Sequence, residues 1–145
     1  MKIKSILGFV CAMMFLGCTI SSNKTIENGL EDKFDAESIT NDFFKYQKSN
    51  DIKATIEMFS ADFIRKNGKD NLIKLLNNNR LKLGSLKKYS LEKWETKIIK
   101  GSNSSSYYFL VYNNEYEKYH ATESFQMNKG FFGKIKITDY KLELN

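Results

Sequence analysis

The sequence has no proline, one histidine, two cysteines and, among 23 basic residues, only two arginines, Arg65 and Arg80. Cysteine and histidine are too few to form a structural zinc site. The formal net charge of +6 does not by itself indicate nucleic-acid binding, since bidentate recognition of phosphates and bases favours arginine over lysine. A glycine-rich phosphate loop, a cysteine–histidine pair and a nucleophile elbow are also missing. We therefore predict no metal, no cofactor and no nucleic-acid partner.

The 145 residues are 41% hydrophobic and 14% aromatic, which is too apolar for a disordered chain. No segment repeats at the period of a solenoid or a propeller. A chain of this length buries about two thirds of its surface on folding, so it needs no disulfide or metal to hold a core. The composition predicts one compact globular domain.

The N-terminus has the organisation of an export signal. Lys2 and Lys4 form a short positive region, and an apolar run follows from residue 6 to residue 16. This run falls within the roughly 7 to 15 residues of a signal peptide's hydrophobic region and is shorter than the about 20 residues that a membrane span requires. We predict that this segment directs export and is then removed.

The apolar run ends in Phe15-Leu16-Gly17-Cys18, which resembles the lipobox of bacterial lipoproteins. The resemblance implies that residues 1–17 are removed and that Cys18 carries a thioether-linked diacylglycerol and an acylated amine. Several acyl chains on one residue hold a protein stably at a membrane without spanning it. The alternative is an ordinary signal peptide with Cys18 free or paired, but Cys11 lies in the removed segment and leaves no partner. Thr19 in place of aspartate favours the outer membrane, facing the periplasm.

Residues 18–33 have the polar composition of a lipidated, flexible tether, and residues 34–145 form the single globular domain. Apolar residues recur near helical spacing in the first half of this domain. Asn67-Gly68 is a predicted turn, Gly84 marks a helix end, and Asp51 and Asp70 are candidate N-caps. The predicted helices cover residues 35–48, 52–59 and 70–83.

After Gly84 the apolar period changes to two, and aromatic and β-branched residues predominate. The apolar phase of the last segment switches between Ile137 and Tyr140, which predicts a bulge or bend near Thr138-Asp139. Residues 107–112 are apolar or aromatic throughout, as in a central strand buried on both faces. The predicted strands are 86–99, 107–112, 116 or 119–127 and 131–144, with turns at 101–105, 113–114 and 128–130.

This order predicts an α+β fold in which N-terminal helices pack on a strongly curved antiparallel sheet of about four strands. The element order and the closing segment, Gly133 to Leu144, resemble the cystatin-like, nuclear-transport-factor-two-like cone fold. Small bacterial lipoproteins of unknown function built on this fold are the most similar group. Members of the fold include isomerases, dehydratases, carriers and adhesive modules, so the resemblance implies an architecture and not an activity.

The candidate site lies on the predicted third strand. Glu123 shares a face with Tyr119, Ala121 and Phe125, where burial would raise the pKa of its carboxyl group toward that of a general acid or base. The alternative is a rim position in which Glu123 pairs with a lysine. Asp139 is a second candidate acid at the predicted bend.

Tyr112 and Tyr119 belong to a tyrosine cluster that forms either a pocket with these acids or the packed faces of the sheet. His120 falls on the opposite, polar face, where we expect it to meet solvent. A run of lysines forms either a solvated surface or a basic stripe near anionic lipid. This run comprises Lys82, Lys87, Lys88, Lys93, Lys97 and Lys100.

Three functions are compatible with these features. The first is a lipid-anchored, non-catalytic binding or accessory domain for an envelope protein or a small apolar ligand. The second is a small hydrolase or isomerase that uses Glu123 or Asp139 inside the cone. The third is an inhibitor or immunity-type lipoprotein that binds a protein partner. The first is our leading expectation, because no catalytic set is present.

Overall fold

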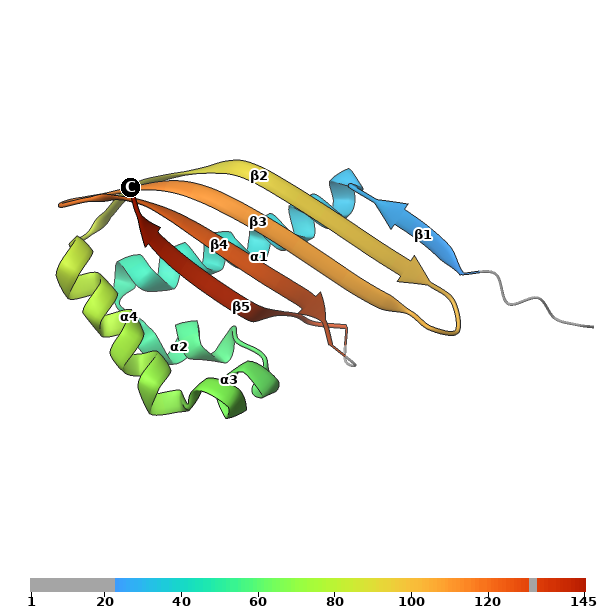
Figure 1. Ribbon diagram of the computed structural model, residues 1–145, viewed down its shortest axis with the longest axis horizontal. Helices are drawn as coiled ribbons and strands as arrows, with labels where there is room; N and C mark the ends of the chain where they lie inside the picture. The colour runs from blue at the N-terminus through green and yellow to red at the C-terminus, as the bar shows by residue number, and fades with distance from the viewer. Residues whose placement is uncertain (1–22, 131–132) are drawn as a thin grey trace, which may run out of the picture.

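The computed structural model describes residues 23–130 and 133–145, so the export signal and Cys18 lie outside the described residues. The fold is α+β, with one layer of helices on one face of an open, five-stranded antiparallel sheet (Figure 1). The strands run in chain order across the sheet. The elements are β1 (Lys24–Glu27), α1 (Leu30–Ser49), α2 (Ile52–Glu57), α3 (Ala61–Asn67), α4 (Lys69–Leu83), β2 (Leu86–Lys100), β3 (Ser105–Tyr116), β4 (His120–Lys129) and β5 (Ile135–Leu144).

Side-chain caps and a glycine define the helix boundaries. The Asp51 carboxylate accepts a hydrogen bond from the Ala54 N–H at 2.9 Å and begins α2, as predicted. The Ser60 hydroxyl caps α3, a helix that the sequence did not predict. Asp70 is not the cap of α4, because this helix already begins at Lys69. Gly84 ends α4 as predicted, in a backbone conformation with φ +76° that L-amino acids with a side chain rarely adopt.

The β4–β5 pairing confirms the predicted irregularity. Gln126 pairs with Asp139 and Met127 pairs with Ile137, so Thr138 has no opposite residue on β4. One extra residue on one strand is a β-bulge, and it reverses the face on which later side chains lie. The switch of apolar phase in the sequence therefore has a direct structural cause.

Two predicted segments were wrong. Residues 24–27 lie in the expected tether but form β1, the edge strand that pairs with residues 97–100 of β2. Residues 113–114 were predicted as a turn, yet β3 continues through them to Tyr116. Strand pairing on both sides of β3 outweighs the turn preference of asparagine here, and the Asn114 side chain is buried.

The core lies between the helices and the inner face of the sheet. Phe43 and Phe44 of α1 contact Phe125 of β4, with ring centroids 5.0 and 5.7 Å apart. On β3 the burial prediction is correct for one face only. Tyr108 and its inner neighbours are buried, whereas Tyr107 and its outer neighbours are half-buried on the face that carries no helix.

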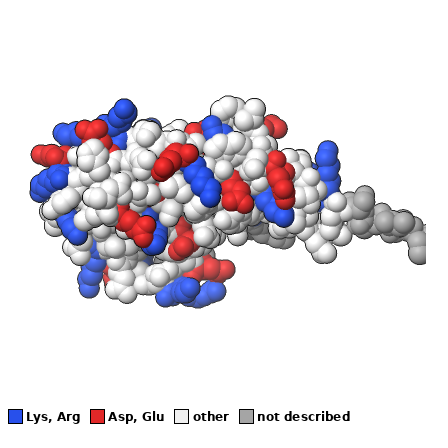
Figure 2. All heavy atoms as spheres, turned by 45° about the horizontal axis from the view of Figure 1, so that its top comes forward, with Lys and Arg blue, Asp and Glu red and all other residues white. Residues whose placement is uncertain are grey.

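The surface has no extended region of one charge on the face that Figure 2 shows, where basic and acidic side chains alternate. None of the helices in the described ranges is long and apolar enough to cross a membrane.

Candidate functional site

Glu123 is the central residue of the candidate site. It lies on the inner face of β4, in alternation with Ala121 and Phe125, and its exposed fraction is 0%. In the sheet register it is opposite Tyr112 on β3 and Leu142 on β5. The predicted apolar face is therefore confirmed, and the alternative of a solvent-exposed rim position is wrong.

Three neutral donors surround the Glu123 carboxylate. The Asn114 amide donates to Oε1 and the Tyr140 hydroxyl donates to Oε2, each at 2.7 Å. The Tyr116 hydroxyl donates to Oε1 as well. Within residues 23–130 and 133–145, no basic side chain forms an ion pair with this carboxylate. Hydrogen bonds from uncharged groups thus replace both water and a counter-ion.

The same burial changes the acidity of all three acidic groups in this network. Burial raises the pKa of Glu123, and the hydrogen bonds from Tyr116, Tyr140 and Asn114 offset part of that rise. Burial and the nearby Glu123 charge also raise the pKa of both tyrosines well above the usual value for a phenol. The phenols therefore keep their protons, and the carboxyl group is the one that titrates first.

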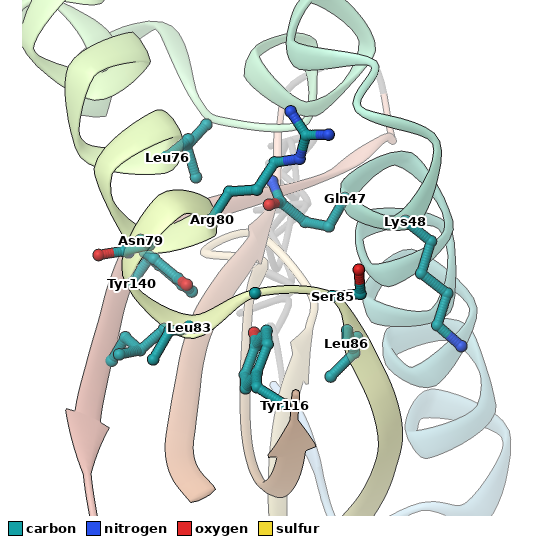
Figure 3. A pocket seen from close by; sticks show the side chains of 12 residues that line it. Gln47, Lys48, Leu76, Asn79, Arg80, Leu83, Ser85, Leu86, Tyr116 and Tyr140 are labelled. Carbon is teal, nitrogen blue, oxygen red and sulfur yellow. The ribbon is translucent and has the colours of Figure 1, made fainter. Parts of the chain in front are cut away.

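A cavity of about 270 Å³ lies beside this network, between the end of α1, the end of α4 and the start of β2. We call it the tyrosine cavity, because Tyr116 and Tyr140 line it (Figure 3) and their hydroxyls bind Glu123. The other lining residues are Gln47, Lys48, Leu76, Asn79, Arg80, Leu83, Gly84, Ser85, Leu86 and Leu142.

The cavity has an apolar wall, a tyrosine end and the guanidinium group of Arg80, which forms no ion pair within the described ranges. Arg80 extends from α4 into the space toward α1 (Figure 3). Lys48 also lines the cavity, but its ammonium group lies 5.3 Å from the ring centroid of Tyr89 and points away from the cavity centre. Arg80 is therefore the cation that a bound group would meet.

The tyrosine hydroxyls face the cavity as acceptors. A phenol has one proton, and Tyr116 and Tyr140 each give theirs to Glu123. Burial is the largest cause of the raised pKa of Tyr140, and the nearby Asn79 side chain lowers that pKa against it. Toward a ligand, these hydroxyl oxygens can only accept a hydrogen bond. This end of the cavity therefore favours a ligand group that donates hydrogen bonds.

The structure does not bring the four predicted pocket residues together. Asp139 is exposed on the outer face of β5, opposite Gln126, and so lies across the sheet from Glu123. Tyr112 is buried in the core, where its hydroxyl lies 2.6 Å from the Thr40 hydroxyl. Tyr119 is 44% exposed, because it precedes β4 and the face alternation begins only at His120. His120 itself is exposed, as predicted.

The sequence did not predict any of the three residues that hold Glu123. Asn114 and Tyr116 continue the inner-face alternation of Tyr108 and Tyr112, but the predicted turn at 113–114 concealed that pattern. Tyr140 is opposite Phe125, two residues from Glu123 on the same face, and only the strand register places it there. Extending the period-two pattern of β3 to Tyr116 would have identified two of the three.

The hydrogen-bond partners of Glu123 limit the chemistry that its carboxyl group can perform. Both carboxylate oxygens are already bound, and no other acid or base hydrogen-bonds to Glu123 in the described parts of the chain. No group of three or more His, Cys, Asp or Glu side chains there could hold a metal ion.

No protein-family model, no curated protein and no solved structure matches this chain.

Proposed function

We propose that the protein is a lipoprotein of the bacterial cell envelope whose domain binds a small molecule in the tyrosine cavity and catalyses no reaction on it. The lipobox Phe15-Leu16-Gly17-Cys18 supports anchoring through acylated Cys18, with the domain in the periplasm at the outer membrane. Helices followed by an open antiparallel sheet with a bulged last strand support the cystatin-like, nuclear-transport-factor-two-like cone as the finer fold.

One observation carries the binding function: a fully buried carboxylate without a counter-ion holds two cavity-lining hydroxyls. Burying a carboxyl group costs free energy that an apolar residue of similar size would not cost. What the network provides is a fixed position for the Tyr116 and Tyr140 hydroxyls at the cavity wall, which is the preorganisation that ligand sites require.

The lining defines the ligand class. A group that donates hydrogen bonds, such as an ammonium or amide group, fits the acceptor oxygens of Tyr116 and Tyr140. An apolar middle fits the leucine wall, and a carboxylate or another acceptor fits the Arg80 guanidinium. The volume of about 270 Å³ suits a small amphipathic molecule, for example an amino acid or a very short peptide, and is below the usual range for drug-sized ligands.

A thermal-shift screen of amino acids, dipeptides and small amines tests this function. We expect hits whose stabilising effect is lost in Arg80→Ala and reduced in Tyr140→Phe. Arg65→Ala is the matched control, because Arg65 is the other arginine, lies on α3 and pairs with Asp62 away from the cavity. If Arg80→Ala and Arg65→Ala reduce the stabilisation by a hit equally, or if no compound stabilises the protein, the tyrosine cavity is not the binding site.

Metabolic labelling with a lipid precursor tests the anchor separately. Incorporation into the wild-type protein and its loss in Cys18→Ser, together with release from the membrane fraction, are the expected results. Unchanged labelling of Cys18→Ser would refute acylation at this residue and leave the cavity assignment to its own test.

A hydrolase or isomerase that uses Glu123 is the second candidate. The observation in its favour is the raised pKa of a buried carboxyl group in contact with two phenols, which allows proton transfer to a ligand through a tyrosine hydroxyl. Incubating each hit with protein and analysing products by mass spectrometry separates the two functions. Turnover that disappears in Glu123→Gln while binding persists would replace the binding function with catalysis.

A further inference from the structure

The described chain begins against one turn of the sheet. Gly101 follows β2, and a Cβ atom built there would lie 2.1 Å from Asn23 Oδ1 and 3.2 Å from Asn23 Cα. Glycine at this position therefore allows Asn23 to pack on the β2–β3 turn, and β1 then pairs with the last residues of β2. The chain leaves the domain toward Cys18 at this end of the sheet (Figure 1).

The distance from this end to the acylated residue is short. Only five peptide steps separate Cys18 from Asn23, and five residues span at most about 18 Å in any conformation. A tether that lasted to residue 33 would reach about 50 Å. Because β1 belongs to the sheet, the proposed anchor holds the domain close to the membrane with a defined end toward it.

Lysines are gathered at this end of the sheet. In an antiparallel sheet ordered by sequence, the β2–β3 and β4–β5 turns lie at the same end, together with the start of β1. Lys24 is directly opposite Lys100 across the β1–β2 pair, an arrangement of like charges that destabilises a sheet. Lys129 and Lys134 flank the β4–β5 turn.

Few of these charges are neutralised within the domain. Glu27 pairs with Lys97 at 3.1 Å, and Asp35 lies 3.9 Å from Lys129. In the part of the chain that the structure describes, Lys24, Lys100 and Lys134 form no ion pair. Figure 2 shows a basic side chain beside the point where the grey trace leaves the described domain.

We propose that this end of the sheet docks on anionic phospholipid headgroups, with Lys24, Lys100 and Lys134 as the contact residues. The inference rests on the proposed acylation of Cys18, which brings these lysines to the surface. Each lysine near an anionic bilayer strengthens association about fivefold. The arrangement also accounts for the opposed pair of Lys24 and Lys100, since headgroup phosphates between them relieve the repulsion.

Docking in this orientation leaves the tyrosine cavity open. Tyr116 ends β3 and Leu86 begins β2, so the cavity is at the end of the sheet opposite Lys24 and Lys100. Lys87 and Lys88 also lie at that far end, so the lysines of β2 do not form one stripe. A ligand arriving from the periplasm meets the cavity rather than the membrane.

The test uses the full-length lipidated protein in vesicles of phosphatidylcholine, with or without phosphatidylglycerol, and a dansyl-labelled lipid. Trp94 is the only tryptophan and serves as the energy donor. We expect energy transfer from Trp94 to the dansyl group to be more efficient when phosphatidylglycerol is present. This increase should be lost in about 1 M salt, where the Debye length falls to about 3 Å. In Lys24→Gln/Lys100→Gln we expect association with the anionic surface to weaken about 25-fold. The increase in energy transfer that phosphatidylglycerol causes then disappears.

The matched control is Lys87→Gln/Lys88→Gln, which removes the same charge from the other end of β2 and keeps the increase. Protein that fails to float with phosphatidylcholine vesicles lacks the anchor, which overturns both the anchor and the docking that depends on it. Protein that floats but transfers energy equally in both vesicle types overturns docking alone. An equal loss in both lysine variants also overturns it, because the effect then follows net charge and not this end of the sheet.

Discussion

Replacing Glu123 with glutamine removes the buried carboxyl group and leaves a side chain of nearly the same shape. In the unfolded chain the pKa of this carboxyl is about 4.3, and burial raises it in the folded protein. Between these two values the folded state holds one proton that the unfolded state has lost. Stability therefore falls by up to about 1.4 kcal/mol per pH unit in that window. The stabilising contribution is complete below the unfolded pKa and is lost as pH rises through the folded pKa.

Glutamine does not titrate, so Glu123→Gln lacks this loss. The free energy of unfolding of the variant, relative to that of the wild type, must improve as pH rises above the unfolded pKa of about 4.3. Urea unfolding followed by Trp94 fluorescence at several pH values measures both. Glu115→Gln is the control, because the Glu115 side chain is exposed on the same sheet and is not a hydrogen-bond partner in the network. If the free energies of unfolding of the wild type and of Glu123→Gln differ by the same amount at every pH, burial does not raise the pKa of Glu123.

Three further changes test the fold. Tyr112→Phe removes the buried hydrogen bond to Thr40 and should cost about 1 kcal/mol in urea unfolding; no loss would mean that this contact contributes nothing net. Gly101→Ala forces a Cβ atom against Asn23 and should cost about 1 to 3 kcal/mol and speed amide exchange in β1, whereas unchanged exchange would contradict the packing of the chain on the β2–β3 turn. Ser60→Ala removes the N-cap of α3 and should cost about 1 kcal/mol by thermal unfolding, while Ser60→Thr retains most of the stability.

The sequence predicted the elements whose signals are local. The change of period at Gly84 separates the helices from the strands, and the phase switch near Thr138 identifies the bulge. β1 was missed because its four residues include only one half-buried side chain, Ile26, and the rest resemble a polar tether. A strand this short exists because β2 offers it an edge, which no pattern within residues 24–27 encodes.

The site was predictable only in its centre. The alternation of Ala121, Glu123 and Phe125 correctly indicated a carboxyl group on the apolar face. Its partners come from β3 and β5, and their positions depend on strand register, which is set by the turns and the bulge rather than by any one segment. The turn preference of asparagine led to the wrong prediction at Asn114, where the amide in fact serves the buried carboxylate.

The central claim is that a small ligand binds between Arg80 and the two tyrosines that Glu123 holds. NMR of protein labelled with ¹³C at the tyrosine Cζ atoms, titrated with a hit from the thermal-shift screen, tests it most directly. We expect the Tyr116 and Tyr140 resonances to shift with the ligand, the Tyr107 resonance on the outer face to stay unchanged, and Arg80→Ala to abolish the shifts. Shifts confined to Tyr107, or shifts at Tyr116 and Tyr140 that persist unchanged in Arg80→Ala, would contradict it.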